Sequence, residues 1–249
     1  MDATEQNGLV IFLSPRFLFC IFGDSATVRE AIEREGIHPM AVILFDIDGT
    51  LVDTTGPMTQ AIHEALEELP HLPKPSEEAV RSGYGLAGNA FWEHVIPEAT
   101  LEEIRLIRRL RHTTLEKTME GQNVLFDGIR DMLETLHEQG HTLTTASNCG
   151  VHYMNLILDT QQIRSYMTAP ECLESVSGEK KADILTAHRV RHGEADYVMV
   201  GDRKSDVEAA RAHDFPVVLT GFGFGNEEEW ALADHVIQSP NDLVEWVNR

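Results

Sequence analysis

Residues 41–54 read AVILFDIDGTLVDT and join a short apolar run to two closely spaced carboxylates. The run 41–45 is continuously apolar, which is typical of a strand buried on both faces of a parallel sheet. Asp46 and Asp48 follow it, and residues two apart in an extended chain point to the same side. Gly49 permits a sharp exit into a loop. The stretch therefore predicts an α/β fold with a ligand site at the carboxyl end of its first strand.

Similar apolar runs recur along the chain and alternate with helical patterns. Further buried strands are expected at Leu143–Ala146, Tyr197–Val200 and Val217–Leu219, with a weaker fifth at His235–Ile237. Amphipathic helical patterns occur at Ile129–Glu138 and Asp206–His213. This alternation predicts a doubly wound, Rossmann-like parallel sheet with helices on both faces.

An unusually long segment separates the first two expected strands. The gap of nearly a hundred residues is far more than one crossover helix needs, and much of it, including Leu101–Met119, has a helical pattern. We expect an inserted helical domain at 55–124, with the α/β core formed by 40–54 and 125–249. The role of residues 1–39 stays open between an extension upstream of an internal start at Met40, an added strand and a partner-binding arm.

Composition limits the possible partners. The chain has 249 residues, of which 42% are hydrophobic and 24% charged, as in ordinary globular proteins and unlike disordered or membrane chains. It carries 20 Lys and Arg against 41 Asp and Glu, a formal net charge of −21. Because nucleic-acid binding needs a basic surface, we expect no nucleic-acid partner.

Cysteine usage and the N-terminal apolar stretch bear on location. Cys20, Cys149 and Cys172 form no CxxC pair or ligand-like cluster, which argues against structural zinc and a disulfide framework. The apolar stretch 9–22 is interrupted by a proline and an arginine and is too short to span a bilayer. We therefore expect a cytoplasmic protein with no membrane partner, either a monomer or a homodimer.

Polar residues also follow two later strands. Ser147 and Asn148 follow the second strand, which predicts a hydroxyl at the start of the next helix, where free backbone N–H groups favour an anion. Asp202 follows the third strand, and Asp206 would lie in the first turn of the helix after it. Each residue alone could be a solvated loop residue or a helix cap. Their joint order predicts one site at the carboxyl edge of the sheet.

These motifs in this order resemble the haloacid dehalogenase-like hydrolase superfamily. DIDGTLVDT, ASN, a lysine at 180–181 and GDRKSD match its capped phosphatases over residues 40–249. The run GFGFG at 221–225 resembles the loop after the fourth core strand of phosphoglycolate phosphatase-like members. The resemblance implies a sheet core that carries catalysis and a helical cap inserted after the first motif.

The resemblance also implies roles for the motif residues. Asp46 would be the nucleophile that forms an aspartyl-phosphate, and Asp48 the general acid and then the base. Mg²⁺ would be held by Asp46, the backbone carbonyl of Asp48, Asp202 and Asp206. The phosphoryl oxygens would be bound by Ser147, Asn148 and the motif lysine.

Two points of this assignment depart from the common pattern or stay open. The chain has Lys180-Lys181 in place of the family's usual Lys-Pro pair, and the spacing to Asp183 resembles the family's Lys-x-acid variant, which favours Lys181. In the cap, Arg81 is a candidate substrate-binding residue, together with Tyr84, Asn89 and Trp92. The basic stretch of the 101–119 helix, which contains Arg105, Arg108, Arg109 and Arg111, is expected to be a solvated face paired with Glu102, Glu103 and Glu116.

The leading functional hypothesis is a Mg²⁺-dependent phosphatase of small phosphorylated metabolites, with phosphoglycolate-like acids as candidates. A sugar-phosphate mutase uses the same acids and is the main alternative. A nucleotidase or a non-catalytic phosphate-binding member is less favoured. Dehalogenation is disfavoured, because dehalogenating members of the family need no acid at the position of Asp48.

Overall fold

The computed structural model describes residues 40–248, and the segment 1–39, with its apolar stretch 9–22 and the roles considered for it, lies outside the described residues. The strands are Ala41–Phe45 (β1), Thr142–Ser147 (β2), Glu171–Cys172 (β3), Asp196–Gly201 (β4), Val217–Thr220 (β5) and His235–Ile237 (β6). The helices are Thr55–Ala65 (α3), Glu77–Gly83 (α4), Asn89–Val95 (α5), Leu101–Met119 (α6), Ile129–Glu138 (α7), Val151–Thr160 (α8), Lys181–His192 (α9), Lys204–Arg211 (α10), Glu227–Trp230 (α11) and Pro240–Val247 (α12), with 3-10 turns at Leu66–Glu68 (η1) and Arg164–Tyr166 (η2).

The six strands form one parallel sheet in the order β3-β2-β1-β4-β5-β6. At the end of β1, Phe45 lies beside Thr145 of β2 on one side and Val200 of β4 on the other. The residues that follow these three strands therefore meet at one edge of the sheet. The expected doubly wound parallel sheet is confirmed, and β3, with only two residues, is too short for a sequence pattern to reveal.

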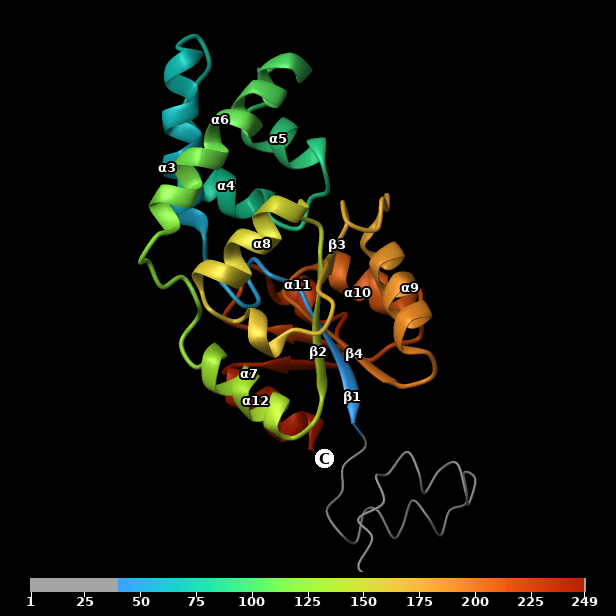
Figure 1. Cartoon of the computed structure of the whole chain (residues 1–249). Coiled ribbons are helices and arrows are strands. Elements are labelled where there is room, and N and C mark those ends of the chain that lie inside the picture. Colours follow the sequence, from blue (N-terminus) through green and yellow to red (C-terminus); the bar gives the residue numbers. More distant parts are fainter. Residues whose placement is uncertain (1–39, 249) are drawn as a thin grey trace, which may run out of the picture. The chain divides into compact units, whose positions relative to one another are not determined.

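Helices cover both faces of the sheet (Figure 1). Alternate residues of β1 point to opposite faces, so Ile43 and Phe45 pack into one apolar cluster and Val42 and Leu44 into another. The first cluster also holds buried residues of α7, α8 and α12, and the second holds those of α9 and α10. Burial on both faces explains why β1 is apolar at every position.

The helices α3 to α6 follow β1 in the chain and form a group beyond the end of the sheet (Figure 1). They pack through buried residues such as Ile62 of α3 with Ile104 and Ile107 of α6. A capping box starts α6: Thr100 Oγ1 accepts from the Glu103 N–H, and the Glu103 carboxylate accepts from the Thr100 N–H. The helices expected at Leu101–Met119 and Ile129–Glu138 are present with those bounds.

Two local features differ from expectation. Helix α8 begins at Val151, so Ser147 is the last residue of β2 and a short loop separates it from the helix. The loop ends in Gly150, whose backbone turns the chain into the helix in an extended conformation. Helix α10 begins at Lys204, two residues earlier than the pattern indicated, which leaves Asp206 in its first turn as expected.

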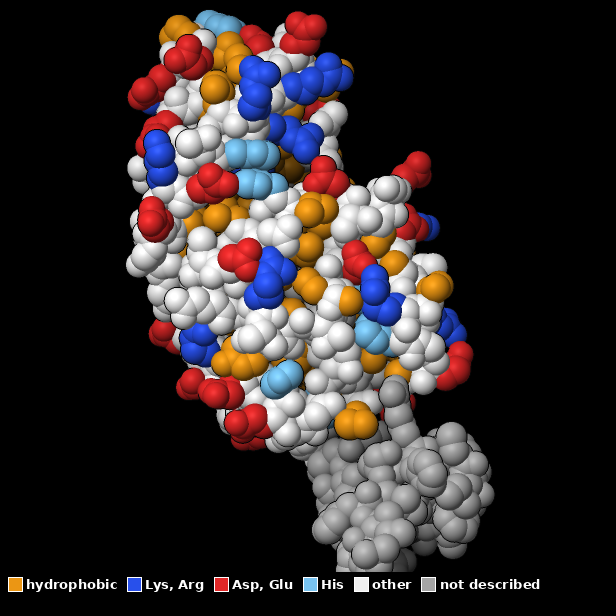
Figure 2. Space-filling model, in the orientation of Figure 1, with side chains coloured by type: hydrophobic (Ala, Val, Ile, Leu, Met, Phe, Trp, Pro, Cys, Tyr) orange, Lys and Arg blue, Asp and Glu red, His pale blue; other side chains and the backbone are white. Residues whose placement is uncertain are grey.

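The surface carries mixed charge. Figure 2 shows acidic and basic side chains over the whole visible face, with several of the basic ones over α5 and α6. Within residues 40–248, none of the helices has the length and apolar character needed to cross a membrane.

Candidate active site

Three buried carboxylates meet at the carboxyl edge of the sheet. Asp46 follows β1, Asp202 follows β4 and Asp206 lies in the first turn of α10. One side-chain oxygen from each lies within 4.8 Å of the others. Burial, together with repulsion from neighbouring carboxylates, raises the pKa of Asp202 well above its usual value and also raises the pKa of Asp206. The sequence prediction that these three acids converge therefore agrees with the geometry.

Lys181 joins this cluster from the first turn of α9. Its Nζ lies 2.8 Å from Asp46 Oδ2 and 2.5 Å from Asp206 Oδ1, and the side chain is buried. Burial alone would lower the pKa of Lys181, but the two carboxylates outweigh it and raise the pKa. Lys180, the helix N-cap, is exposed. Of the two candidate lysines, the structure brings Lys181 to the acids.

The carboxylate cluster fits a hard divalent cation. Asp202 Oδ2 accepts a hydrogen bond from the Phe224 N–H at 2.9 Å, whereas Asp202 Oδ1 is buried without a hydrogen-bond partner among the described residues. A buried carboxylate oxygen without a donor is costly unless a cation contacts it. All the side-chain donors are oxygens, the ligand type that Mg²⁺ prefers. The side chains of Asp46, Asp202 and Asp206 would therefore hold the metal.

Asp48 has different surroundings from Asp46. Its carboxylate lies outside the cluster of Asp46, Asp202 and Asp206, and its Oδ1 accepts from Thr54 Oγ1 at 2.7 Å and from Tyr153 Oη at 2.5 Å. Burial, partly offset by these two hydrogen bonds, raises the pKa of Asp48 to about 7. A carboxyl group with that pKa can donate and accept a proton near neutral pH.

Ser147 and Asn148 lie at the same edge. Ser147 is buried at the end of β2, and both residues line the cavity that contains Asp46 and Asp48. Asn148 Nδ2 donates to the Gly85 carbonyl at 2.8 Å, in the loop between α4 and α5. Asn148 Oδ1 is buried and has no hydrogen-bond partner within residues 40–248.

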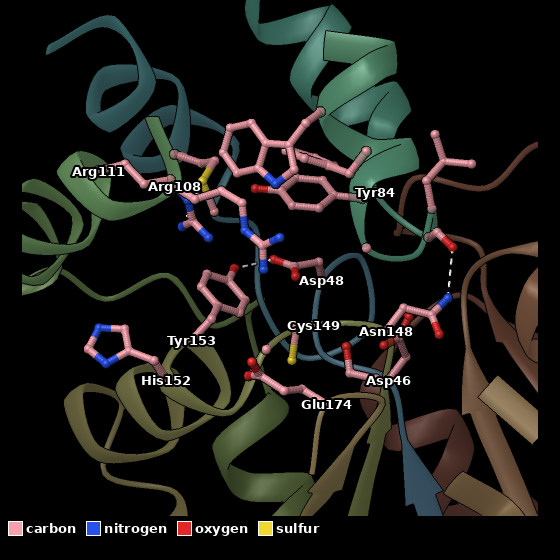
Figure 3. A pocket seen from close by; sticks show the side chains of 18 of the residues that line it. Asp46, Asp48, Tyr84, Arg108, Arg111, Asn148, Cys149, His152, Tyr153 and Glu174 are labelled. Atoms are coloured by element: carbon pink, nitrogen blue, oxygen red, sulfur yellow. Dashed lines mark hydrogen bonds between the residues drawn. The ribbon is translucent and has the colours of Figure 1, made fainter. Parts of the chain in front are cut away.

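The cavity has a volume of about 220 Å³ and lies between the sheet edge and the inserted helices (Figure 3). From the core it is lined by Asp46, Asp48, Ser147, Asn148, Cys149, Gly150, His152, Tyr153 and Glu174. From the insert it is lined by Met58, Tyr84, Gly85, Leu86, Gly88, Phe91, Trp92, Arg108, Arg111 and His112. Ligand pockets for drug-sized molecules are typically about 300–1,000 Å³, so this cavity suits a small metabolite.

Arg81 does not line this cavity. Its guanidinium lies 3.8 Å from Asp53 Oδ2 and over the ring of Phe224, 5.7 Å from the centroid. Tyr84 and Trp92 from the same expected substrate loop do line it, whereas Asn89 is exposed and does not.

The arginines of α6 differ from the expected solvated face. Arg108 and Arg111 line the cavity. Two of the glutamates expected to pair with them have other partners: Glu103 caps α6 and contacts His71 at 2.7 Å, and Glu116 lies 3.2 Å from His152 Nε2. The helical pattern identified the basic residues, but the face they occupy depends on how α6 packs over the core.

Hydroxyl groups around Asp48 are the main contacts that the sequence pattern did not indicate. Thr54 Oγ1 lies 2.7 Å from the Oη of Tyr153 and 2.8 Å from that of Tyr84. Thr54 lies six positions after Asp48 in the first motif, so the sequence already places these two residues in one segment. Tyr153 and Tyr84 come from α8 and the insert, and only the tertiary packing brings them to Asp48.

The GFGFG run packs against the first motif. A Cβ on Gly223 would lie 2.1 Å from the Gly49 carbonyl oxygen, so only glycine fits there. Thr220 Oγ1 donates to the same carbonyl at 2.9 Å. Together with the Phe224 N–H on Asp202, these contacts fix the loops that carry Asp48 and Asp202.

Known proteins share both the sequence pattern and the fold. A sequence model described as haloacid dehalogenase-like hydrolase matches residues 43–220. Phosphoglycolate phosphatase of Salmonella typhimurium is 28% identical over 228 residues, covering 81% of this chain and 90% of that protein. Phosphoglycolate phosphatase of Escherichia coli K12 is 26% identical with the same coverage.

Solved structures give the same fold at low identity. The structure of CbbY from Rhodobacter sphaeroides in complex with phosphate aligns with a TM-score of 0.70 and 20% identity, covering 82% of this chain and 96% of that one. A hydrolase from Pseudomonas syringae aligns with a TM-score of 0.69 and 22% identity, covering 84% and 98%. The family match spans well over half of the residues and includes both acidic motifs. This chain therefore belongs to the haloacid dehalogenase-like hydrolases.

Proposed function

We propose that this protein is a Mg²⁺-dependent phosphatase that hydrolyses a small phosphorylated metabolite through an aspartyl-phosphate on Asp46. The observation that carries the proposal is the contact of Lys181 Nζ with both Asp206 and Asp46, of which Asp46 lines a small cavity; Asp202 lies in the same acidic cluster. Bound Mg²⁺ would neutralise charge that develops on the transferring phosphoryl group.

The chain's own residues divide the chemistry in two steps. An Asp46 oxygen attacks phosphorus, the bond to the leaving oxygen breaks, and protonated Asp48 gives that oxygen its proton. Asp48 then takes a proton from a water molecule, which attacks the phosphorus of the aspartyl-phosphate and releases phosphate and the free Asp46 carboxylate. The pKa of Asp48, about 7, suits it to both transfers.

The phosphoryl oxygens need donors at the same edge. Ser147 Oγ and the Lys181 ammonium supply them, and Asn148 orients the bound group from the neighbouring loop. We propose that residues 55–124 act as a cap over this site. The contact of Asn148 Nδ2 with the Gly85 carbonyl, and of the Arg203 guanidinium with the Tyr84 carbonyl at 3.1 Å, join the insert to the core beside the cavity.

The size of the cavity and the similarity to phosphoglycolate phosphatases favour a phosphoglycolate-like substrate. The test is release of inorganic phosphate from phosphoglycolate and from an aryl phosphate, with Mg²⁺ present. Asp46→Asn should reduce the rate by at least about 10³-fold, since it removes the nucleophile. Asp127→Asn is the matched control, because Asp127 is exposed and outside the site. An Asp46→Asn rate near that of the wild type would overturn the mechanism.

A further inference from the structure

Two arginines reach the cavity from the inserted helices. Arg108 and Arg111 are three residues apart on α6 and therefore lie on one face of the helix. Both line the cavity that contains Asp46 and Asp48, and Figure 3 shows them on the α6 side of it, across from Asp46. Figure 2 shows several basic side chains over α5 and α6, in a chain whose net charge is −21.

Arg111 is partly buried and has few partners of its own. Its Nε is buried without a hydrogen-bond partner among the described residues, and its Nη1 reaches only the Met58 sulfur, at 3.5 Å, a weak acceptor. The guanidinium lies over the Trp92 ring, 5.1 Å from the centroid. Burial lowers the pKa of Arg111, yet a guanidinium stays charged in proteins.

No carboxylate in residues 40–248 forms an ion pair with either guanidinium. Asp48 is near enough to act on the charge of Arg111, but its Oδ1 accepts hydrogen bonds from Thr54 and Tyr153. Glu116 contacts His152, and Glu174 accepts the Val151 N–H at 2.6 Å. Burial and the charge of Arg111 lower the pKa of His112, and an imidazole in either form carries no negative charge to offset a guanidinium. A partly buried guanidinium with a buried, unpartnered N–H is unfavourable, and an anion in the cavity would supply the missing acceptor.

We propose that Arg108 and Arg111 bind a second anionic group of the substrate, a carboxylate, while its phosphoryl group lies at Asp46, Ser147 and Lys181. The proposal rests on the proposed function and names the residues that would select its substrate among phosphate esters, by recognising the carboxylate of a short phosphorylated acid. A guanidinium matches a carboxylate with two parallel N–H donors. The small cavity leaves room for only a short spacer between the two anionic groups.

The test compares phosphoglycolate with ethyl phosphate, which replaces the carboxylate by a methyl group. Wild-type kcat/KM should favour phosphoglycolate by on the order of 10- to 100-fold, the usual effect of a hydrogen-bonded charge. Arg111→Met and Arg108→Gln should each reduce this ratio by about tenfold or more. Arg105→Gln is the control on the same helix, because Arg105 is exposed and does not line the cavity, and it should keep the ratio.

Binding gives a second readout that is independent of turnover. In the Asp46→Asn background, calorimetric affinity for phosphoglycolate should fall by about tenfold or more with Arg108→Gln. Melting curves of each variant report whether it folds.

The possible outcomes separate this inference from the proposed function. The carboxylate site would be overturned if the wild-type ratio of kcat/KM for phosphoglycolate to that for ethyl phosphate were near one, or if neither arginine variant changed it. Asp46-dependent hydrolysis of ethyl phosphate would still support the proposed phosphatase in that case. A higher kcat/KM for ethylene glycol bisphosphate than for phosphoglycolate would reassign the arginines to a second phosphate. Absence of hydrolysis of every ester would overturn the proposed function itself, and with it this inference.

Discussion

Asp46 and Asp48 come from one motif but face different partners. Asp46 contacts the Lys181 ammonium, whereas Asp48 accepts hydrogen bonds from two hydroxyl groups in an otherwise enclosed position. The Lys181 ammonium holds the Asp46 carboxylate in place, while burial raises the pKa of Asp48 to about 7, where a carboxyl group exchanges protons. These different environments suit the two acids to the different steps of the proposed mechanism.

Asp48 should make the stability of the metal-free protein depend on pH. Its pKa rises from 3.8 in the unfolded chain to about 7 in the fold, so the folded state holds the proton more tightly. The resulting stabilisation is complete below pH 4 and is lost as pH rises through 7. The free energy of unfolding of Asp48→Asn, relative to that of the wild type, should therefore rise by up to about 4 kcal/mol from pH 4 to pH 8.

Urea unfolding in excess chelator at both pH values measures this difference. The raised pKa values of Asp202 and Asp206 are common to both proteins and cancel in the comparison. A difference between the two proteins that does not change with pH would show that Asp48 titrates normally.

The two adjacent lysines should behave differently. Lys181→Ala leaves two buried carboxylates without their cation, and breaking a buried ion pair typically costs about 3–5 kcal/mol. It should also reduce kcat by at least about 10²-fold, because a donor to the phosphoryl group is lost. Lys180→Ala removes an exposed side chain and should change both quantities little. Rates of phosphate release and melting temperatures of the two variants test this difference. A larger loss in Lys180→Ala than in Lys181→Ala would contradict the placement of Lys181.

At the scale of elements, the sequence predicted what local periodicity encodes. The continuously apolar β1, the α6 helix and the order of motifs at strand ends follow from patterns of a few residues. The side of α6 that meets the core depends on packing between distant segments, so Arg108 and Arg111 could not be placed in the cavity. The same reason hid Tyr153, which reaches Asp48 across 105 positions of sequence.

The loop after β5 offers a test at this scale. Gly223→Ala would bring a methyl group against the Gly49 carbonyl, and such overpacking typically costs about 1–3 kcal/mol. It should also lower activity, because the displaced loop carries the Phe224 N–H that holds Asp202. Gly56→Ala is the matched control, since Gly56 lies in α3 with open space around it. This substitution should stabilise the protein slightly, because alanine favours a helix more than glycine does. Equal melting temperatures for the two variants would contradict the packing of this loop on the first motif.

For the whole molecule, the net charge of −21 and an anionic substrate are compatible because the charges are arranged locally. Three acids gather at one point, where Mg²⁺ would convert their repulsion into attraction for phosphate, and two arginines face the same cavity. The total charge, readable from the sequence, excludes a broad polyanion surface but does not show this arrangement.

Mg²⁺ should therefore stabilise the folded protein. At 100 times its dissociation constant, a ligand that binds only the folded state adds about 2.7 kcal/mol. Asp202→Asn should remove most of this gain, since it alters the carboxylate whose Oδ1 has no other partner among the described residues. Thermal melting with and without Mg²⁺ measures the effect, and hydrolysis should cease in excess chelator. An equal Mg²⁺ shift in Asp202→Asn would place the metal elsewhere.

The central claim is that Asp46 carries the phosphoryl group during turnover. Borohydride reduces an acyl phosphate to an alcohol, so a reaction quenched during hydrolysis of phosphoglycolate and then reduced should contain homoserine at position 46. Peptide mass spectrometry locates the change, and Asp46→Asn should show none. Homoserine in place of a different aspartate, or phosphate release by Asp46→Asn at an undiminished rate, would contradict the account.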